Sequence, residues 1–112
     1  MRRLHYSGGY VLTADDVCKA LLRYARALAD TQSSDVVSIP VLAEGGARGN
    51  AHFLIGPASQ LYSTPVSDAV EEIEDASLVE ELQRRTRRLQ TDVAEWPDMM
   101  EDANLGYGED EY

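Results

Sequence analysis

Apolar residues recur at helical spacing between residues 13 and 30. Large side chains appear there every three or four positions, namely Val17, Leu21, Tyr24 and Leu28. This spacing places them on one face of a 3.6-residue repeat. Thr13, followed three residues later by Asp16, is the pattern of a capped helix start, so the helix is expected to begin there.

The polar stripe of this helix is narrow. It is made of Lys19, Arg23, Arg26 and Asp30. A second flank of small and apolar residues lies beside it, namely Cys18, Leu22, Ala25 and Ala29. A helix that rests on one sheet needs an apolar arc of only about 100°. We therefore expect a second element to cover this flank; the alternative is that the alanines are only helix formers on an exposed side.

Alternating patterns predict strands on both sides of the helix. Residues 36–43 alternate, with Pro40 indicating an edge strand or a bulge because it lacks an N–H. The glycine-rich stretch 44–49 predicts a hairpin connection, and residues 50–55 alternate again as the return strand. Residues 60–66 are consistent with a third strand. Before the helix, residues 10–12 are β-prone, and residues 4–6 could pair back with them across Gly8 and Gly9.

These patterns predict an α+β fold with a small antiparallel sheet, β-α-β-β-β, and one helix packed on a face. The small α+β domain covers residues 1–66. An acidic linker at 67–76, a charged amphipathic helix at 77–96 and an acidic disordered tail at 97–112 follow it.

The predicted C-terminal helix carries a regular apolar seam. Ser77 and Glu80 form a capping-box pattern at its start. The seam has alternating spacings of three and four residues and consists of Val79, Leu82, Thr86, Leu89, Val93 and Trp96. We expect it to dock on the spare flank of the first helix, with self-association or a foreign partner as the alternatives. The candidate partner-binding residues are Leu82, Arg84, Arg85, Arg88, Leu89 and Trp96.

Charge separates the two halves of this chain of 112 residues. Residues 1–66 hold five acidic and six basic residues, a net charge of +1, whereas 67–112 hold fifteen acidic and four basic residues, a net charge of −11. The single cysteine excludes an intramolecular disulfide. The chain contains neither a signal-peptide pattern at its start nor an apolar run long enough for a membrane span, so a cytoplasmic location without membrane association is expected.

No motif in the sequence specifies a reaction, a metal site or a cofactor. The glycine-rich stretch joins two strands and lacks the Lys-Ser/Thr ending of a phosphate loop. His5 and His52 are the only histidines, and neither has a spacing typical of a catalytic or zinc site. The sequence therefore predicts no catalytic, cofactor-binding or metal-ligating residue and a protein that is not an enzyme.

The loop at residues 56–60 is the most suggestive site for a small ligand. Its Ser59 and Gln60 could present polar groups beside exposed backbone N–H groups. The alternative is a turn that ends the strand, with Ser59 capping it.

The arginine cluster at residues 84–88 has three interpretations. Glu80 and Glu81 stand four residues before Arg84 and Arg85, the favourable order for helical ion pairs, which predicts a self-neutralised face. An acidic protein partner and nucleic acid are the other two. The overall hypothesis is a non-enzymatic protein-interaction or regulatory module; a small-ligand-binding or enzymatic domain using 56–60 and a nucleic-acid-associated protein using 84–88 are the alternatives.

Overall fold

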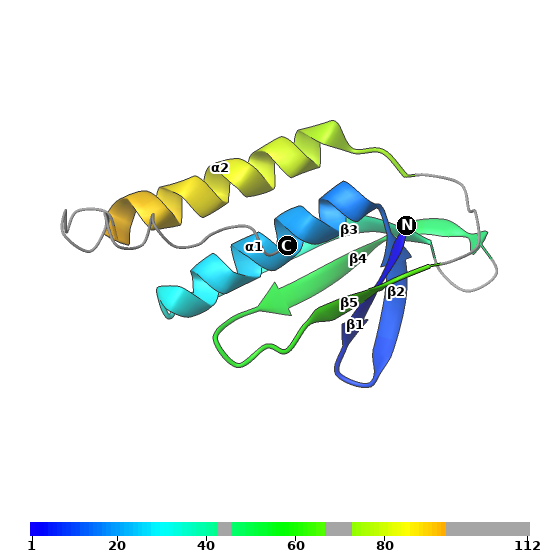
Figure 1. Cartoon of the computed structure of the whole chain (residues 1–112), viewed down its shortest axis with the longest axis horizontal. Coiled ribbons are helices and arrows are strands. Elements are labelled where there is room, and N and C mark those ends of the chain that lie inside the picture. Colours follow the sequence, from blue (N-terminus) through cyan, green and yellow to red (C-terminus); the bar gives the residue numbers. More distant parts are fainter. Residues whose placement is uncertain (43–45, 67–72, 94–112) are drawn as a thin grey trace.

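The computed structural model describes residues 1–42, 46–66 and 73–93, which form one antiparallel sheet and two helices (Figure 1). The elements follow in the order β1 (Arg2–Tyr6), β2 (Gly9–Thr13), α1 (Asp15–Asp30), β3 (Asp35–Leu42), β4 (Arg48–Ile55), β5 (Tyr62–Pro65) and α2 (Ala76–Val93). The sheet order is β4-β3-β2-β1-β5, and every neighbouring pair is antiparallel. The predicted α+β class is confirmed, with one strand more than the predicted pattern.

The additional strand is β1, which forms a tight hairpin with β2. The register runs from Arg2 opposite Thr13 to Tyr6 opposite Gly9, so only Ser7 and Gly8 lie in the turn. Gly8 has a φ of +86°, a conformation that glycine adopts without steric cost. The pairing of residues 4–6 with 10–12 that the sequence allowed is thus present, but β1 begins two residues earlier, at Arg2, and β2 extends one residue further at each end.

The β3–β4 hairpin is long, and most of it does not pair with the other strands of the sheet. All eight residues of β3 pair with β4, from Asp35 opposite Ile55 to Leu42 opposite Arg48. In contrast, β2 meets β3 at a single pair, Leu12 opposite Leu42. The prediction that Pro40 lies on an edge strand is wrong, because β3 lies between β4 and β2 in the sheet. Pro40 nevertheless lies where β2 no longer pairs with β3, so its missing N–H breaks no bond to β2.

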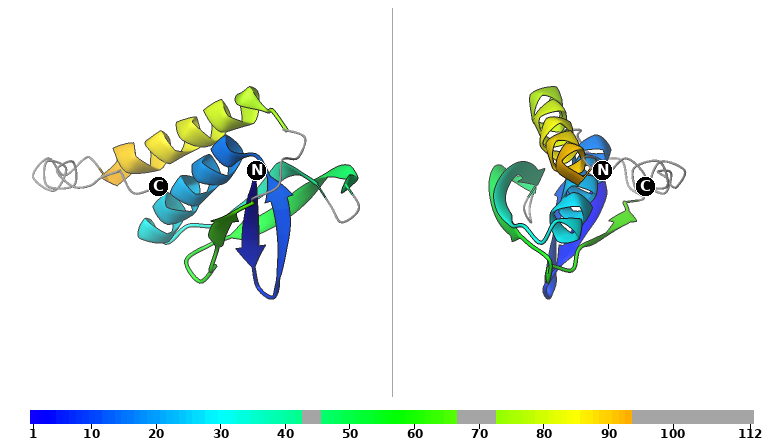
Figure 2. Two further views of the ribbon diagram at one scale, coloured as in Figure 1. Left: turned by 45° about the vertical axis from the view of Figure 1, so that its right-hand side comes forward. Right: turned by 90° about the vertical axis from the view of Figure 1, so that its left-hand side faces the viewer.

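Helix α1 lies between the sheet and α2 (Figure 2). Seven of its residues are buried, namely Val17, Cys18, Ala20, Leu21, Tyr24, Ala27 and Leu28. Leu82 of α2 is fully buried in the same core, and Leu78, Val79 and Leu89 pack against it. Helix α2 thus packs in the same core as α1. Within the flank expected to be covered, Cys18 is buried and lies near Ser63 of β5, whereas Leu22, Ala25 and Ala29 are half-buried. Coverage of this flank by α2 therefore stays a prediction.

Both predicted helix caps are wrong. Thr13 is the last residue of β2 and is fully buried; its hydroxyl donates to the carbonyl of Pro40 at 2.8 Å. Helix α1 therefore starts at Asp15, with Ala14 as a cap that provides no side-chain bond. Helix α2 starts at Ala76, and the Asp75 carboxylate, not Ser77, accepts a bond from the Leu78 N–H at 3.1 Å.

Part of the predicted linker belongs to the packed core. Within 67–76, Ile73 is buried in the core and Ala76 begins α2. Residues 67–72 of that range and the predicted tail at 97–112 lie outside the described residues. Within the residues that are described, no helix is long and apolar enough to cross a membrane.

Candidate functional site

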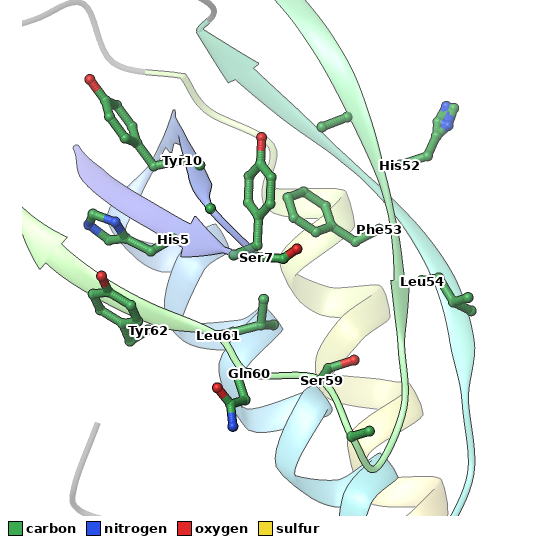
Figure 3. Close-up of a pocket in the computed structure, with 15 residues that line it drawn as sticks. His5, Ser7, Tyr10, His52, Phe53, Leu54, Ser59, Gln60, Leu61 and Tyr62 are labelled. Atoms are coloured by element: carbon green, nitrogen blue, oxygen red, sulfur yellow. The ribbon is translucent and has the colours of Figure 1, made fainter.

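An open pocket of about 940 Å³ lies where the β1–β2 hairpin and the β3–β4 hairpin diverge (Figure 3). Three segments line it: residues 5–10 of the β1–β2 hairpin, residues 51–54 of β4, and residues 58–62 of the loop that leads into β5. Strand β2 pairs with β3 at only one position, Leu12 opposite Leu42, so the two hairpins separate beyond it. The chain between β4 and β5 forms one side of the pocket, because it connects two strands that lie at opposite edges of the sheet.

Aromatic and small side chains form the inner walls of the pocket. The rings of Tyr6 and Phe53 meet edge to face, with centroids 5.4 Å apart at an angle of 81°. Leu61 enters from the loop, as Figure 3 shows. Strand alternation explains the direction of Phe53: its neighbours His52 and Leu54 point away from the opening while Phe53 points into it.

A second group of rings forms the rim of the pocket. His5 of β1 and Tyr62 of β5 stack in parallel, with centroids 4.3 Å apart, and the His5 Nε2 lies 3.0 Å from the Thr64 hydroxyl. Tyr10 of β2 lies 5.6 Å from His5, and the Arg3 guanidinium stands 5.3 Å from the centre of the Tyr10 ring. Tyr10 and Tyr62 remain 51% and 61% exposed, so their faces are available to a ligand.

The rim belongs to the outer face of the sheet, which is the side that points away from α1. Its residues follow from the strand registers and are Arg3, His5, Tyr10, Leu12, Val36, Ser38, Pro40, Leu42, Arg48, Asn50, His52, Leu54, Tyr62 and Thr64. None of them is acidic. Every acidic residue in the described ranges lies in α1, in α2, in the segment 73–75 or, in the case of Asp35, on the helix side of β3.

The two residues predicted for a ligand loop are both at this pocket. The Ser59 hydroxyl accepts a bond from the Gly56 N–H at 3.0 Å, and the Ser59 N–H donates to the Gly56 carbonyl at 3.1 Å. Ser59 therefore closes the turn, as the alternative interpretation held. Gln60 is exposed and lines the same pocket. Ligand contact by either residue stays a prediction.

The arginine cluster of α2 is largely paired. Arg84 and Arg85 both bind Glu81, Arg85 at 2.8 Å, and these bonds lower the Glu81 pKa to about 2. Arg85 also reaches the carboxylate of Asp35 at 3.0 Å. The Tyr24 hydroxyl donates to the same carboxylate at 2.5 Å. This network joins α2 to α1 and β3, so a large share of the cluster's positive charge is used inside the molecule.

The candidate partner-binding residues of α2 divide into two groups. Leu82 is fully buried and Leu89 is half-buried against the core, so the seam serves packing within the chain. Arg84 and Arg88 are exposed on the opposite side of α2. Trp96 lies outside the described residues. A partner that approaches α2 would therefore meet the arginines and not the seam.

The site offers little for reaction chemistry. Within 1–42, 46–66 and 73–93, no cluster of three or more histidines, cysteines, aspartates or glutamates could hold a metal ion. Burial raises the pKa of the Cys18 thiol, which keeps it protonated and unreactive. His52 points away from the pocket and His5 is held against Tyr62. What remains is an aromatic-walled pocket suited to binding.

Sequence patterns did not reveal this pocket. Its aromatic residues come from β1, β2, β4 and β5, and only strand pairing brings them together. The one available signal was alternation, which assigns His5, Tyr10 and Tyr62 to a common face once the register is known. Comparison of the chain with protein-family models, with curated proteins and with solved structures found no match.

Proposed function

We propose that this protein is a non-enzymatic binding module that holds an extended, acidic segment of a partner protein. An apolar side chain of the partner is anchored in the pocket between the β1–β2 hairpin and β4. The observation that carries the proposal is an aromatic-walled pocket whose rim lies on a sheet face that has no acidic side chain among the described residues. In protein interfaces, a few anchors that fill such pockets contribute most of the binding free energy.

Exposed apolar side chains extend the surface beyond the pocket. Val36 and Leu54 are cross-strand neighbours on the outer face, and they are 60% and 72% exposed. Together with Tyr10 and Tyr62 they are the large apolar residues most exposed in the described part of the chain. Apolar area of this kind beside an anchor pocket supports a protein ligand over a small polar one.

The charge distribution supports an acidic ligand. Arg3 and Arg48 are the cationic residues of the outer face, whereas the described acidic residues lie in the helices, in the segment 73–75 or on the helix side of β3. An acidic segment meets no carboxylate among the described residues of the outer face. Such complementarity directs encounter and orientation more than it adds affinity.

The other candidate functions have weaker support. An enzyme would gather titratable groups around the reacting atoms, and this pocket is lined mainly by aromatic, small and neutral polar side chains. Nucleic-acid binding needs several cations that track phosphates. The outer face has two arginines, and Arg84 and Arg85 of α2 are paired with carboxylates.

A displayed library of random linear peptides tests the proposal. Selection on the full chain should enrich peptides that combine acidic and large apolar residues. Phe53→Ala removes a wall of the pocket and should weaken the selected peptides about tenfold or more. Leu22→Ala is the matched control, because Leu22 is a half-buried apolar residue of α1 that does not line the pocket.

A second variant guards against an effect on folding. Ala58 is exposed at the pocket, so Ala58→Trp should fill the opening without disturbing the core. Both pocket variants should lose peptide binding while their unfolding curves stay cooperative. Selected peptides that bind wild-type and both pocket variants equally would overturn the proposal, as would selection of basic peptides.

A further inference from the structure

We infer that the partner segment binds as an additional β-strand along the free edge of β4, with alternate side chains entering the pocket. The inference rests on the proposed function and adds the conformation and sequence pattern of the ligand. Addition of a strand to a sheet edge is a recurrent way of binding extended peptides. Main-chain hydrogen bonds provide affinity, and pockets for alternate side chains provide specificity.

The free edge of β4 is long and unpaired in the described structure. β4 is the terminal strand of the sheet, and β3 occupies only one of its sides, over all eight residues. Backbone groups along a strand point alternately to either side, so about half of those in β4 face outward. Within the described ranges, no turn, loop or cap backbone bond involves residues 48–55. The edge is therefore ready for a further strand.

The two edges of the sheet differ in their protection. β5 has four residues, and its last residue is Pro65. Short strands and prolines are common ways of preventing pairing at an edge. β4 has twice that length, contains no proline, and carries one charged residue, Arg48, at its first position. This contrast points to β4 as the edge that accepts a strand.

The pocket lies directly beside this edge. Ala51 and Phe53 of β4 face the helix side of the sheet and line the pocket, whereas His52 and Leu54 face outward. A strand paired with β4 would follow the same alternation. Its inward side chains would lie next to Ala51 and Phe53 and reach the pocket. Its outward side chains would lie beside Asn50, His52 and Leu54.

This alternation defines the partner. The inward positions require apolar side chains, since Tyr6 and Phe53 form the pocket wall. The outward positions adjoin a face that has arginines and no carboxylate among its described residues, which favours acidic residues. The ligand is thus an extended segment in which apolar and acidic residues alternate. A second copy of β4 lacks this pattern, because its only charge is the same Arg48.

A designed peptide tests the inference on the full chain. The parent peptide alternates glutamate with valine and phenylalanine and is blocked at both ends. Two derivatives carry N-methyl groups on the backbone of every second residue. One is methylated at the glutamates and the other at the valines and phenylalanines. Because the N–H groups of only one of these two sets face β4, one derivative should bind about tenfold or more weakly and the other like the parent. Fluorescence anisotropy gives the affinities.

The control peptide has the same composition with its valines and phenylalanines adjacent, and it should bind more weakly than the parent. Hydrogen exchange of the β4 amides should slow when the parent binds. Equal binding of both N-methylated derivatives and the parent would overturn strand addition. Absence of parent binding would overturn the inferred pattern. A dimer of the chain that the parent peptide dissociates would be visible in sedimentation. That result would identify a second copy as the occupant and overturn the choice of a foreign segment.

These outcomes separate the inference from the proposed function. If neither N-methylated derivative is impaired but Phe53→Ala weakens the parent, the pocket anchors a side chain without strand addition. If the parent binds and Phe53→Ala and Ala58→Trp have no effect, the proposed pocket is not the binding site. A single-stranded RNA that displaces the parent would instead support nucleic-acid binding and overturn both.

Discussion

The two faces of the sheet have opposite properties although the same strands form both. On the helix side, Leu4, Ile39 and Ile55 are fully buried, and the polar groups of Thr13 and Asp35 have partners. On the outer face, Leu54 and Tyr62 are mostly exposed. Each fully buried large apolar side chain contributes roughly 1.5–3 kcal/mol to folding. Stability therefore resides on the helix side, which leaves the outer face free to change its residues for binding.

The largest expected effect is on the helix side, at the contact between α2 and α1. Leu82→Ala should lower the free energy of unfolding by about 2–5 kcal/mol, because it leaves a cavity at a fully buried position. Leu54→Ala on the outer face is the matched control and should change it by less than about 0.5 kcal/mol. Denaturant unfolding measures both. A loss of stability in the Leu54 variant as large as in the Leu82 variant would remove the distinction between the faces.

The same experiment at several protein concentrations tests how α2 is held. Intramolecular docking predicts that the loss caused by Leu82→Ala is the same at every concentration. Wild-type stability that rises with concentration would show that the seam of α2 also serves a contact between copies.

A smaller effect is expected from the polar network between Tyr24, Asp35 and Arg85. The hydrogen bond from Tyr24 lowers the pKa of Asp35, whose carboxylate also receives Arg85. A lowered pKa in the folded state contributes stability above the ordinary aspartate pKa of about 4. That stability is lost as the pH falls through the lowered value. Asp35→Asn should thus cost about 1 kcal/mol at neutral pH, since the carboxylate is partly exposed.

The measurement is unfolding free energy as a function of pH below about 5. The Asp35→Asn variant should show a flatter dependence than wild-type in that range. Tyr24→Phe should flatten it in part, because the largest cause of the lowered pKa is removed. Parallel wild-type and variant curves would show that the network does not contribute to the pH dependence.

At the rim of the pocket, stability and binding should separate. Tyr62→Ala removes an exposed ring that stacks on His5, so the free energy of unfolding should fall by less than about 1 kcal/mol. The free energy of binding to the alternating peptide should weaken by more than the free energy of unfolding does, because the ring borders the pocket. Melting curves and anisotropy on the same preparation test this. An equal loss in both would mean that the ring only supports the fold.

The smallest effect is expected on the exposed side of α2. Arg84→Ala removes a surface ion pair with Glu81 and should change the free energy of unfolding by less than about 0.5 kcal/mol. Arg85→Ala is the informative comparison, since Arg85 also holds Asp35 across the helix interface and should cost more. Equal effects of the two variants would show that the contact with Asp35 adds nothing.

Local patterns predicted most of the elements but not their ends. The periodicity of Val17, Leu21 and Leu28 was sufficient for α1, and alternation was sufficient for β3 and β4. The predicted cap of α1 was wrong because the Thr13 hydroxyl has another partner. It donates to the carbonyl of Pro40 across the sheet and does not cap α1. At α2, Asp75 caps a helix that starts one residue before Ser77.

The candidate site was predicted only in part. The loop at 56–60 was singled out, and Ser59 and Gln60 do line the pocket. Tyr6, Tyr10 and Phe53 were not identified, since nothing in the sequence relates a hairpin near the start of the chain to a strand some forty residues later. Only the contact between Tyr6 and Phe53 shows that the two hairpins face one another.

The sequence by itself determined the class of fold, the wide apolar circumference of α1 and the charge difference between the two parts of the chain. These properties depend on spacing and composition, which are local. The tertiary structure alone decided that α2 packs in the same core as α1, that β2 meets β3 at one pair, and that aromatic rings from β1, β2, β4 and β5 line one pocket. Each of these depends on strand register and twist, because a shift of one residue would move every side chain of a strand to the other face.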